Sequence, residues 1–325
     1  MGLKPHQKPG EWFILDRNLI SDLRDQPVFI CGHPKSGTSL VQGILDDHPE
    51  LIVYPEESHF FRRILPKTIR LTKADQLQLA EDLLLHIFTW NQKDQPPSQQ
   101  GYPDRDYSEL SFQLIKEKIW TIPDNHGLRH KGDILAAVIL AFGIVSKQLD
   151  EKGKYWVEKT PYNELHVDRI LSYWPQAKLI HIIRDPRDNY LSYKRKHPEW
   201  SPEFFADNWT RFAFIGIRHQ ENLGDEQYFI IRYEDLVQSP RSVGEKLSDF
   251  LSIRFNESML QPTRIGKHWA GNSMFSRRFD GVSADPVGRW QKMLSSQAVK
   301  VLEAKAGDVM EMFDYSRDLS PDLRT

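Results

Sequence analysis

The sequence predicts an α/β fold in which a mostly parallel central sheet is flanked by helices on both faces. Short apolar runs bounded by turn residues alternate along the chain with longer segments of helical periodicity. Strands that alternate with helices in this way are typical of parallel sheets covered by helices. The 325 residues are 39% hydrophobic, enough for one large core or two smaller ones, and we expect a single domain over residues 1–325.

Five segments are predicted to be strands because they are period-two or solid apolar runs that end at turn residues. They are residues 28–31 (VFIC), 51–54 (LIVY), 155–157 (YWV), 178–183 (KLIHII) and 228–231 (YFII). Between them, apolar residues recur with the helical period. This pattern is clearest in residues 40–45, 76–90, 107–120, 133–149, 164–174, 186–196, 202–222, 242–250 and 296–312.

Residues 65–150 interrupt the alternation. The segment is long, helical and broken by Gln95-Pro96-Pro97, so we expect a helical insertion over the sheet that caps an acceptor site. Its aromatic residues Trp90, Tyr102 and Trp120 either stack on sugar rings or pack in the core.

Charge and cysteine content exclude several classes of protein. Lys and Arg number 43 against 45 Asp and Glu, so a net charge of −2 gives no overall attraction to nucleic acid or to an anionic membrane. Any anion site must therefore be local. The single cysteine, Cys31, excludes an internal disulfide and a cysteine-based zinc cluster, and we expect it to pack at a strand end in a reducing compartment.

No segment has the length of a membrane span or of a signal peptide. Residues 1–27 are mixed and charged, and the longest apolar run, residues 134–145, is too short to cross a bilayer. We interpret that run as a buried helix and expect a soluble, cytoplasmic protein.

The loop at residues 32–39 (GHPKSGTS) carries the first chemical signal. It lies between a predicted strand and a predicted helix, an order that directs backbone N–H groups and a helix N-terminus at a phosphate. Gly32 and Gly37 have the spacing of a phosphate loop, but Thr38 follows the second glycine where nucleotide hydrolases have lysine. The lysine stands earlier, at Lys35.

The magnesium ligand of a nucleotide hydrolase is also missing from the expected place. The apolar run 178–183 ends in Arg184 rather than in an acidic residue. Both changes favour a donor whose transferred group needs no metal. The alternative is an ordinary strand-to-helix turn in which Ser36, Thr38 or Ser39 caps the helix.

Two motifs resemble those of sulfotransferases that use 3′-phosphoadenosine 5′-phosphosulfate. PKSGTS is similar to their 5′-phosphosulfate loop, and HIIRDPRDNYLSYK is similar to their 3′-phosphate motif. The resemblance implies a three-layer P-loop-type fold, this donor and no required metal. It places the 3′-phosphate on Arg184 and Ser192 and the phosphosulfate on the loop residues Lys35, Ser36, Gly37, Thr38 and Ser39. The alternative is that Arg184 pairs with Asp185 or Asp188 at the surface.

A third motif, LIVYPEESHFF at residues 51–61, resembles a segment of glycan and tyrosyl-protein sulfotransferases. On that match Glu57 is the catalytic base, which takes the proton of the attacking hydroxyl. Glu56 and His59 are its rivals. Neighbouring residues on a strand face opposite ways, so only one of the two glutamates can face the donor, and His59 shares the side of Glu57. The alternative is that Glu56 and Glu57 begin a helix and stabilise its dipole, a role that suits Glu56.

Later segments add further donor contacts by resemblance. WVEKTP brings Lys159 near the bridging oxygen of the donor, opposite Lys35, although an exposed lysine at a strand end is the alternative. RYEDL implies that Tyr233 lies near the adenine, with core packing as the alternative. Ser273 and Arg289 are expected to reach the donor phosphates.

The resemblance thus implies in-line transfer of a sulfuryl group to a hydroxyl or amine. It spans residues 28–315 except for the segment 65–150 and leaves the acceptor open between a glycan and a small molecule. Two rival functions remain at this stage. One is a P-loop kinase that needs magnesium and ATP, and the other is a non-catalytic binder of adenosine 3′,5′-bisphosphate.

Overall fold

The computed structural model describes residues 17–88, 105–146, 148, 153–275 and 277–317. Its centre is a sheet of five parallel strands in the order β2-β3-β1-β4-β5. The strands are β1 (Pro27–Cys31), β2 (Leu51–Val53), β3 (Tyr155–Lys159), β4 (Lys178–Ile183) and β5 (Tyr228–Arg232). The predicted fold class is confirmed, and every predicted strand is present within two residues of its expected ends.

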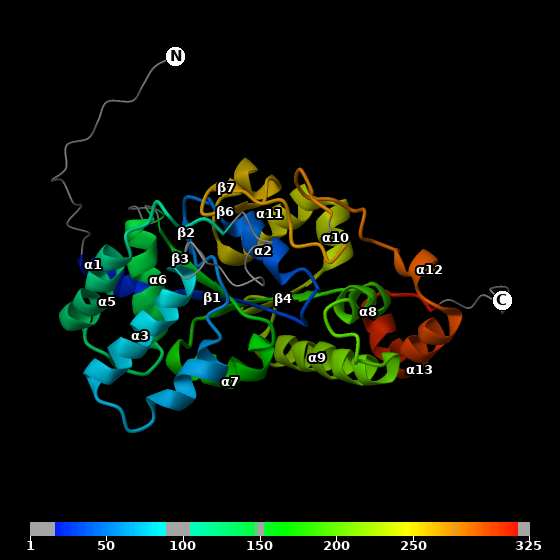
Figure 1. Cartoon of the computed structure of the whole chain (residues 1–325), viewed down its shortest axis with the longest axis horizontal. Coiled ribbons are helices and arrows are strands. Elements are labelled where there is room, and N and C mark those ends of the chain that lie inside the picture. The colour runs from blue at the N-terminus through cyan, green and yellow to red at the C-terminus, as the bar shows by residue number, and fades with distance from the viewer. Residues whose placement is uncertain (1–16, 89–104, 147, 149–152, 276, 318–325) are drawn as a thin grey trace, which may run out of the picture.

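Helices lie on both sides of this sheet (Figure 1). They are α1 (Arg17–Arg24), α2 (Thr38–Leu45), α3 (Lys73–Phe88), α5 (Phe112–His126), α6 (Asp133–Val145), α7 (Val167–Tyr173), α8 (Pro186–Lys194), α9 (Pro202–Leu223), α10 (Tyr233–Gln238), α11 (Pro240–Leu251), α12 (Trp290–Met293) and α13 (Ser296–Met312). The short elements are a π-helix η1 (Phe60–Ile64), the 3₁₀ turns η2 (Leu65–Thr68), η4 (Asn163–His166) and η5 (Glu257–Leu260), and a hairpin of β6 (Thr263–Arg264) and β7 (Lys267–His268).

The period of two in the central strand separates the two main cores. Val28 and Ile30 of β1 join the apolar cluster formed with α2, α10 and α11, whereas Phe29 and Cys31 join the cluster formed with α3, α5 and α6. A third cluster holds α8, α9 and α13 together. Cys31 is fully buried and burial raises the pKa of its thiol, which agrees with a packing role.

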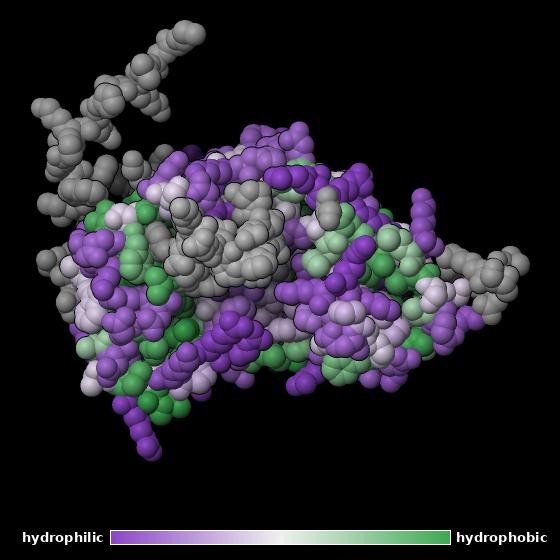
Figure 2. Space-filling model, viewed as in Figure 1, coloured by the Kyte–Doolittle hydropathy of each residue, from purple (hydrophilic) through white to green (hydrophobic). Residues whose placement is uncertain are grey.

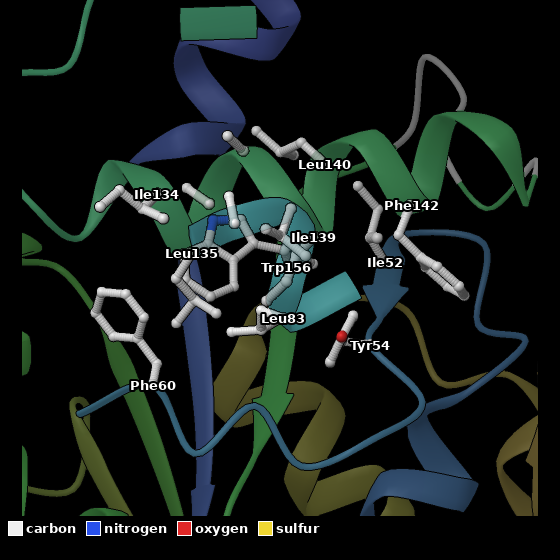
Figure 3. Packing of buried hydrophobic residues seen from close by; sticks show 14 of the residues in the cluster. Ile52, Tyr54, Phe60, Leu83, Ile134, Leu135, Ile139, Leu140, Phe142 and Trp156 are labelled. Carbon is white, nitrogen blue, oxygen red and sulfur yellow. The ribbon is translucent and has the colours of Figure 1, made fainter. Parts of the chain in front are cut away.

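The segment 65–150 contributes part of one helical layer. In Figure 3, Leu135 of α6 lies beside Trp156 of β3, and Phe142 lies beside Ile52 of β2. The indole N–H of Trp120 donates to the carboxylate of Glu81, so this tryptophan ties α5 to α3. Trp90, Tyr102 and the Gln95-Pro96-Pro97 interruption lie outside the described residues.

Two helices begin later than their periodicity predicts. The helix expected from residue 107 begins at Phe112, because the hydroxyl of Ser111 accepts the N–H of Leu114 and caps the helix there. The helix expected from residue 164 starts as the 3₁₀ turn η4 and becomes α-helical at Val167.

Among the described helices, none combines the length and the apolar character needed to cross a membrane. Hydrophilic residues predominate over the face shown in Figure 2.

The topology brings distant segments to one edge of the sheet. Because all five strands are parallel, the residues that follow β1, β3 and β4 emerge at the same carboxyl edge. The chain crosses from one side of β1 to the other between β3 and β4, and ligands of open α/β sheets bind at such a switch point. The loop after Cys31, the end of β3 at Lys159 and Arg184 after β4 therefore meet at this edge.

Candidate active site at the carboxyl edge of the sheet

A cavity of about 530 Å³ opens at the carboxyl edge of the sheet. Most of the predicted site residues line it, namely Lys35, Gly37, Thr38, Ser39, Glu57, His59, Arg184, Ser192, Tyr233, Ser273 and Arg289. The other two, Ser36 and Lys159, are buried and do not line it. The fold therefore brings the predicted residues together from segments that are far apart in the sequence.

The two glycines of the first loop allow the backbone to pass through a crowded space. Gly32 has a φ of 136°, and a Cβ there would collide with the carbonyl oxygen of Ile182. Gly37 has a φ of 112°, and a Cβ would lie 2.6 Å from Cδ2 of Tyr233. A side chain at either position would therefore need both a disfavoured backbone conformation and a movement of its neighbours.

The start of α2 has the features of an anion site. Gly37 is the N-cap residue, so no side-chain hydroxyl caps the helix. Within the described part of the chain, the N–H groups of Gly37, Thr38 and Ser39 have no hydrogen-bond acceptor. The hydroxyl of Ser36 is buried and likewise has no partner among the described residues. Unsatisfied donors at a helix N-terminus favour a negatively charged ligand.

Lys35 extends the same positive region. Burial lowers the pKa of its ammonium to about 8, and the nearby ammonium groups of Lys196 and Lys159 lower it further in the same direction. Its backbone has a φ of 69°, an uncommon conformation for a residue with a side chain. Its side chain therefore loses its proton above about pH 8 unless an anion stabilises the charge.

Arg184 is a buried cation that forms no ion pair with a carboxylate of the described residues. Its side chain is 6% exposed, Nη1 donates to Lys35 O (3.2 Å) and Ser192 Oγ (3.4 Å), and the guanidinium lies 4.4 Å from the ring centre of Tyr233. Among the described residues, its Nε has no hydrogen-bond acceptor. Buried charges are normally paired, so this arrangement indicates an anion-binding position.

The expected rivals for Arg184 are engaged elsewhere. The carboxylate of Asp185 pairs with Arg187 at 2.7 Å, and that of Asp188 accepts the N–H groups of Gly288 (2.6 Å) and Trp290 (2.9 Å). Among the described residues, Arg184 therefore forms no salt bridge with either aspartate, which was the alternative to phosphate binding.

The adjacent glutamates after β2 have different environments. Glu56 is 4% exposed, and its Oε1 accepts from Tyr107 Oη (2.5 Å) and Arg264 Nη1 (3.1 Å) and lies 3.1 Å from Arg105 Nε. Glu57 instead faces the cavity, where its Oε1 lies 2.8 Å from Lys159 Nζ. The first helical element of this segment begins only at Phe60, so Glu56 does not start a helix.

His59 stands between Glu57 and the π-helix η1. Arg62 Nη2 lies 3.4 Å from its Nδ1, and Glu57 Oε2 lies 3.4 Å from its Nε2. Burial lowers the pKa of His59 to about 4, so the ring is neutral at pH 7. Since a guanidinium only donates, Nδ1 accepts and the ring proton lies on Nε2, facing Glu57.

The pKa of Glu57 reflects two opposing effects. Burial raises it, but the ammonium of Lys159 outweighs burial through its charge and its hydrogen bond, and brings the pKa to about 2. Glu57 is therefore ionised at neutral pH. Of Glu57 and His59, it is Glu57 that is oriented to accept a proton.

A second cavity of about 220 Å³ shares His59, Arg62, Pro161 and Tyr162 with the first. Its further lining combines apolar and polar side chains from η1, η4, α9 and the residue after β3, namely Phe61, Thr160, Asn163, Leu165, His166, Asn208 and Phe212.

Sequence reasoning did not identify this second cavity, nor the cations Arg62, Arg63 and Lys196 that line the first. The two arginines directly follow the motif LIVYPEESHFF, and that position was the only signal available.

Comparison with known proteins gives a consistent picture. A family model described as the sulfotransferase family matches residues 27–257. The chain is 22% identical to protein-tyrosine sulfotransferase A of Caenorhabditis elegans over 90% of this chain and 68% of that protein. It is 24% identical to omega-hydroxy-beta-dihydromenaquinone-9 sulfotransferase Stf3 of Mycobacterium tuberculosis over 91% of this chain and 76% of that protein.

Solved structures show the same fold. The sulfotransferase domain of the Synechococcus PCC 7002 olefin synthase superposes with a TM-score of 0.59 at 19% identity, covering 96% of this chain and 99% of that one. Not every relative is of similar length, since the chain spans 30% of an Aquifex aeolicus protein that it also matches.

Proposed function

The chain belongs to the sulfotransferase family, and from this premise we propose that its cavity binds 3′-phosphoadenosine 5′-phosphosulfate and that the acceptor is a hydroxyl or amine of a small molecule or glycan. The observation that carries this proposal is the pair of anion positions in one cavity. One is the N-terminus of α2 with Lys35, and the other is Arg184 with Ser192. Family membership favours sulfuryl transfer over both the kinase and the non-catalytic alternative.

The side chains fit this donor at both of its ends. The N–H groups of residues 37–39, which have no acceptor among the described residues, and the buried hydroxyl of Ser36 suit the phosphosulfate. Arg184 and Ser192 suit the 3′-phosphate, because a dianion is held best by a charged donor together with a hydroxyl.

Three further residues complete the donor side of this proposal. Arg289 lines the same cavity, where it adds a half-buried cation, and Ser273 lines it as well. The ring of Tyr233 lies against the guanidinium of Arg184 and beside Gly37. Tyr233 therefore supports the arginine whether or not it also contacts the adenine.

Glu57 is the base in this proposal, and Lys159 and His59 hold it in place. When bound, the donor supplies an activated sulfuryl group whose S–O bond to the 5′-phosphate breaks as the acceptor oxygen attacks. The acceptor proton passes to Glu57, which is already ionised, accepts a hydrogen bond from Lys159 and lies 3.4 Å from His59 Nε2. Lys35 and Lys159 stabilise the negative charge that develops on the phosphate.

A single substitution tests the donor assignment. Lys35→Ala should lower kcat for transfer of labelled sulfate into a metabolite or glycan extract by at least about a hundredfold, because it removes a charge that stabilises the transition state. The matched control is Lys67→Ala, which removes an exposed lysine that does not line the cavity. Near-normal turnover in a folded Lys35→Ala protein would refute the proposed role.

A further inference from the structure

Three cationic side chains stand at the rim of the main cavity. Arg62 and Arg63 belong to η1 and Lys196 follows α8, and all three are exposed and line the cavity. In the described part of the chain, none of them forms an ion pair with a carboxylate. Among the described residues, the side chain of Arg62 has one hydrogen bond, to His59, and the side chains of Arg63 and Lys196 have none. The set Arg62, Arg63 and Lys196 is called the rim cations below.

Some, but not all, of the exposed arginines elsewhere in the described chain pair with carboxylates. Arg129 pairs with Asp25 at 2.5 Å, Arg218 pairs with Glu221 at 3.0 Å, and Arg241 pairs with Glu257 at 2.7 Å. The rim cations instead gather around a cavity that already contains Lys35 and Arg184. Cations gathered around one cavity repel one another, and a bound anion relieves that repulsion.

The positive charge of the rim acts on the reacting side chains. Lys196 contributes to the lowered pKa of Lys35, and Arg63 and Arg62 contribute to the lowered pKa of His59, after burial in both cases. These effects show that the rim and the site of chemistry share one electrostatic environment.

The position of Arg62 separates the rim from the donor residues. Arg62 and Glu57 approach opposite nitrogens of the same imidazole, His59, so the ring stands between them. Arg62 also lines the second cavity, which contains none of the proposed donor ligands among its described residues. An acceptor that reaches Glu57 from the second cavity would pass directly beside Arg62.

We propose that the acceptor carries an anionic group, a phosphate or a carboxylate, which the rim cations bind. This inference rests on the proposed function and specifies its acceptor. Since Glu57 and Arg62 are separated by one imidazole ring, the anionic group and the attacking hydroxyl are only a few atoms apart in the acceptor. A hydroxy acid or a phosphate ester with a nearby hydroxyl meets this requirement, and a neutral alcohol does not.

The test uses the whole protein saturated with adenosine 3′,5′-bisphosphate, with inorganic phosphate as the probe in isothermal titration calorimetry. Phosphate should bind the wild type saturably, and the triple variant Arg62→Ala, Arg63→Ala, Lys196→Ala should bind it at least about tenfold more weakly because charged hydrogen-bond donors are lost. The charge-matched control is Lys67→Ala, Lys246→Ala, Lys292→Ala, which removes three exposed lysines outside the cavity and should leave phosphate binding unchanged. A parallel titration with acetate identifies the preferred group, since the tighter of the two anions matches the acceptor.

Three results would overturn the inference. The first is that the bisphosphate-loaded wild type binds neither phosphate nor acetate, and the second is that the rim variant binds them as well as the control does. The third is a rim variant that loses affinity for the bisphosphate itself, which would assign the rim cations to the donor. Failure of the proposed function looks different, because then the wild type would not bind the bisphosphate at all.

Discussion

The two ends of the cavity differ in how they are built. The donor end consists of backbone N–H groups at the start of α2 and of the buried Arg184, which is fixed by two carbonyl groups, Ser192 and the ring of Tyr233. The acceptor end consists of long exposed cations on the π-helix η1 and after α8. The first arrangement is preorganised for one ligand, whereas the second can be changed by substituting a few surface residues.

This difference predicts that the donor end tolerates fewer substitutions than the acceptor end. A donor site made of glycine geometry and a buried guanidinium tolerates few replacements, because Cβ atoms at Gly32 and Gly37 would meet other atoms of the site. The exposed Arg62 and Arg63 support no packed core, so their replacement changes the ligand more than the fold. Substitutions at the two ends should therefore change different measured quantities.

The largest effect is expected at Glu57. Glu57→Gln removes the proton acceptor and should lower kcat by about 10²–10⁴-fold while the affinity for adenosine 3′,5′-bisphosphate changes little. Steady-state sulfate transfer and calorimetry measure the two quantities. His59→Ala should lower kcat less, because in this structure the ring orients the carboxylate and does not accept the proton. A greater loss of kcat in His59→Ala than in Glu57→Gln would make His59 the base.

Glu56 provides the matched comparison for Glu57. Glu56→Gln removes the buried charge that pairs with Arg264 and Arg105, so it should lower the free energy of unfolding by about 3 kcal/mol or more. The kcat of the folded fraction should stay near that of the wild type. Urea unfolding measures the first quantity, and a catalytic loss equal to that of Glu57→Gln would contradict the separation of the two roles.

A smaller effect is expected for the fixed cation of the donor end. Arg184→Lys keeps the charge but loses the planar fork that reaches Ser192 and two backbone carbonyls, and it should weaken binding of adenosine 3′,5′-bisphosphate by about 10- to 100-fold. Arg241→Lys, at an exposed pair far from the cavity lining, is the control. Equal affinities in the two variants would show that Arg184 does not bind the donor.

The donor end should also respond to pH through Lys35. Its pKa of about 8 means that the unliganded ammonium loses its proton above pH 8, while an anionic ligand binds the protonated form. The affinity for adenosine 3′,5′-bisphosphate should therefore be highest below pH 8 and fall as the pH rises from 8 to 10, by up to about tenfold per unit. Lys35→Arg, which stays charged, should remove this dependence, and a flat wild-type profile would contradict it.

The same division explains how much of the protein could be predicted from its sequence. The strands and the donor motifs depend on local patterns, and a parallel sheet necessarily brings residues 32–39 and Arg184 to one edge. The roles of Glu56 and Glu57 required the fold, because the partner of Glu56 on β6 is more than 200 residues away. The rim of the cavity could not be predicted, since exposed arginines have no periodic signal and tertiary structure decides whether they meet a carboxylate.

The smallest effect is expected in the described part of the segment 65–150, which supports the site without lining the main cavity. Tyr107→Phe removes the hydroxyl that donates to Glu56 and should lower the free energy of unfolding by about 1–2 kcal/mol, because Arg264 and Arg105 still neutralise the carboxylate. Urea unfolding measures this loss. The control is Tyr155→Phe, because the hydroxyl of Tyr155 has no hydrogen-bond partner among the described residues. The kcat should not change, because no described residue of this segment lines the main cavity. A clear loss of kcat in Tyr107→Phe would mean that the buried network around Glu56 also positions Glu57.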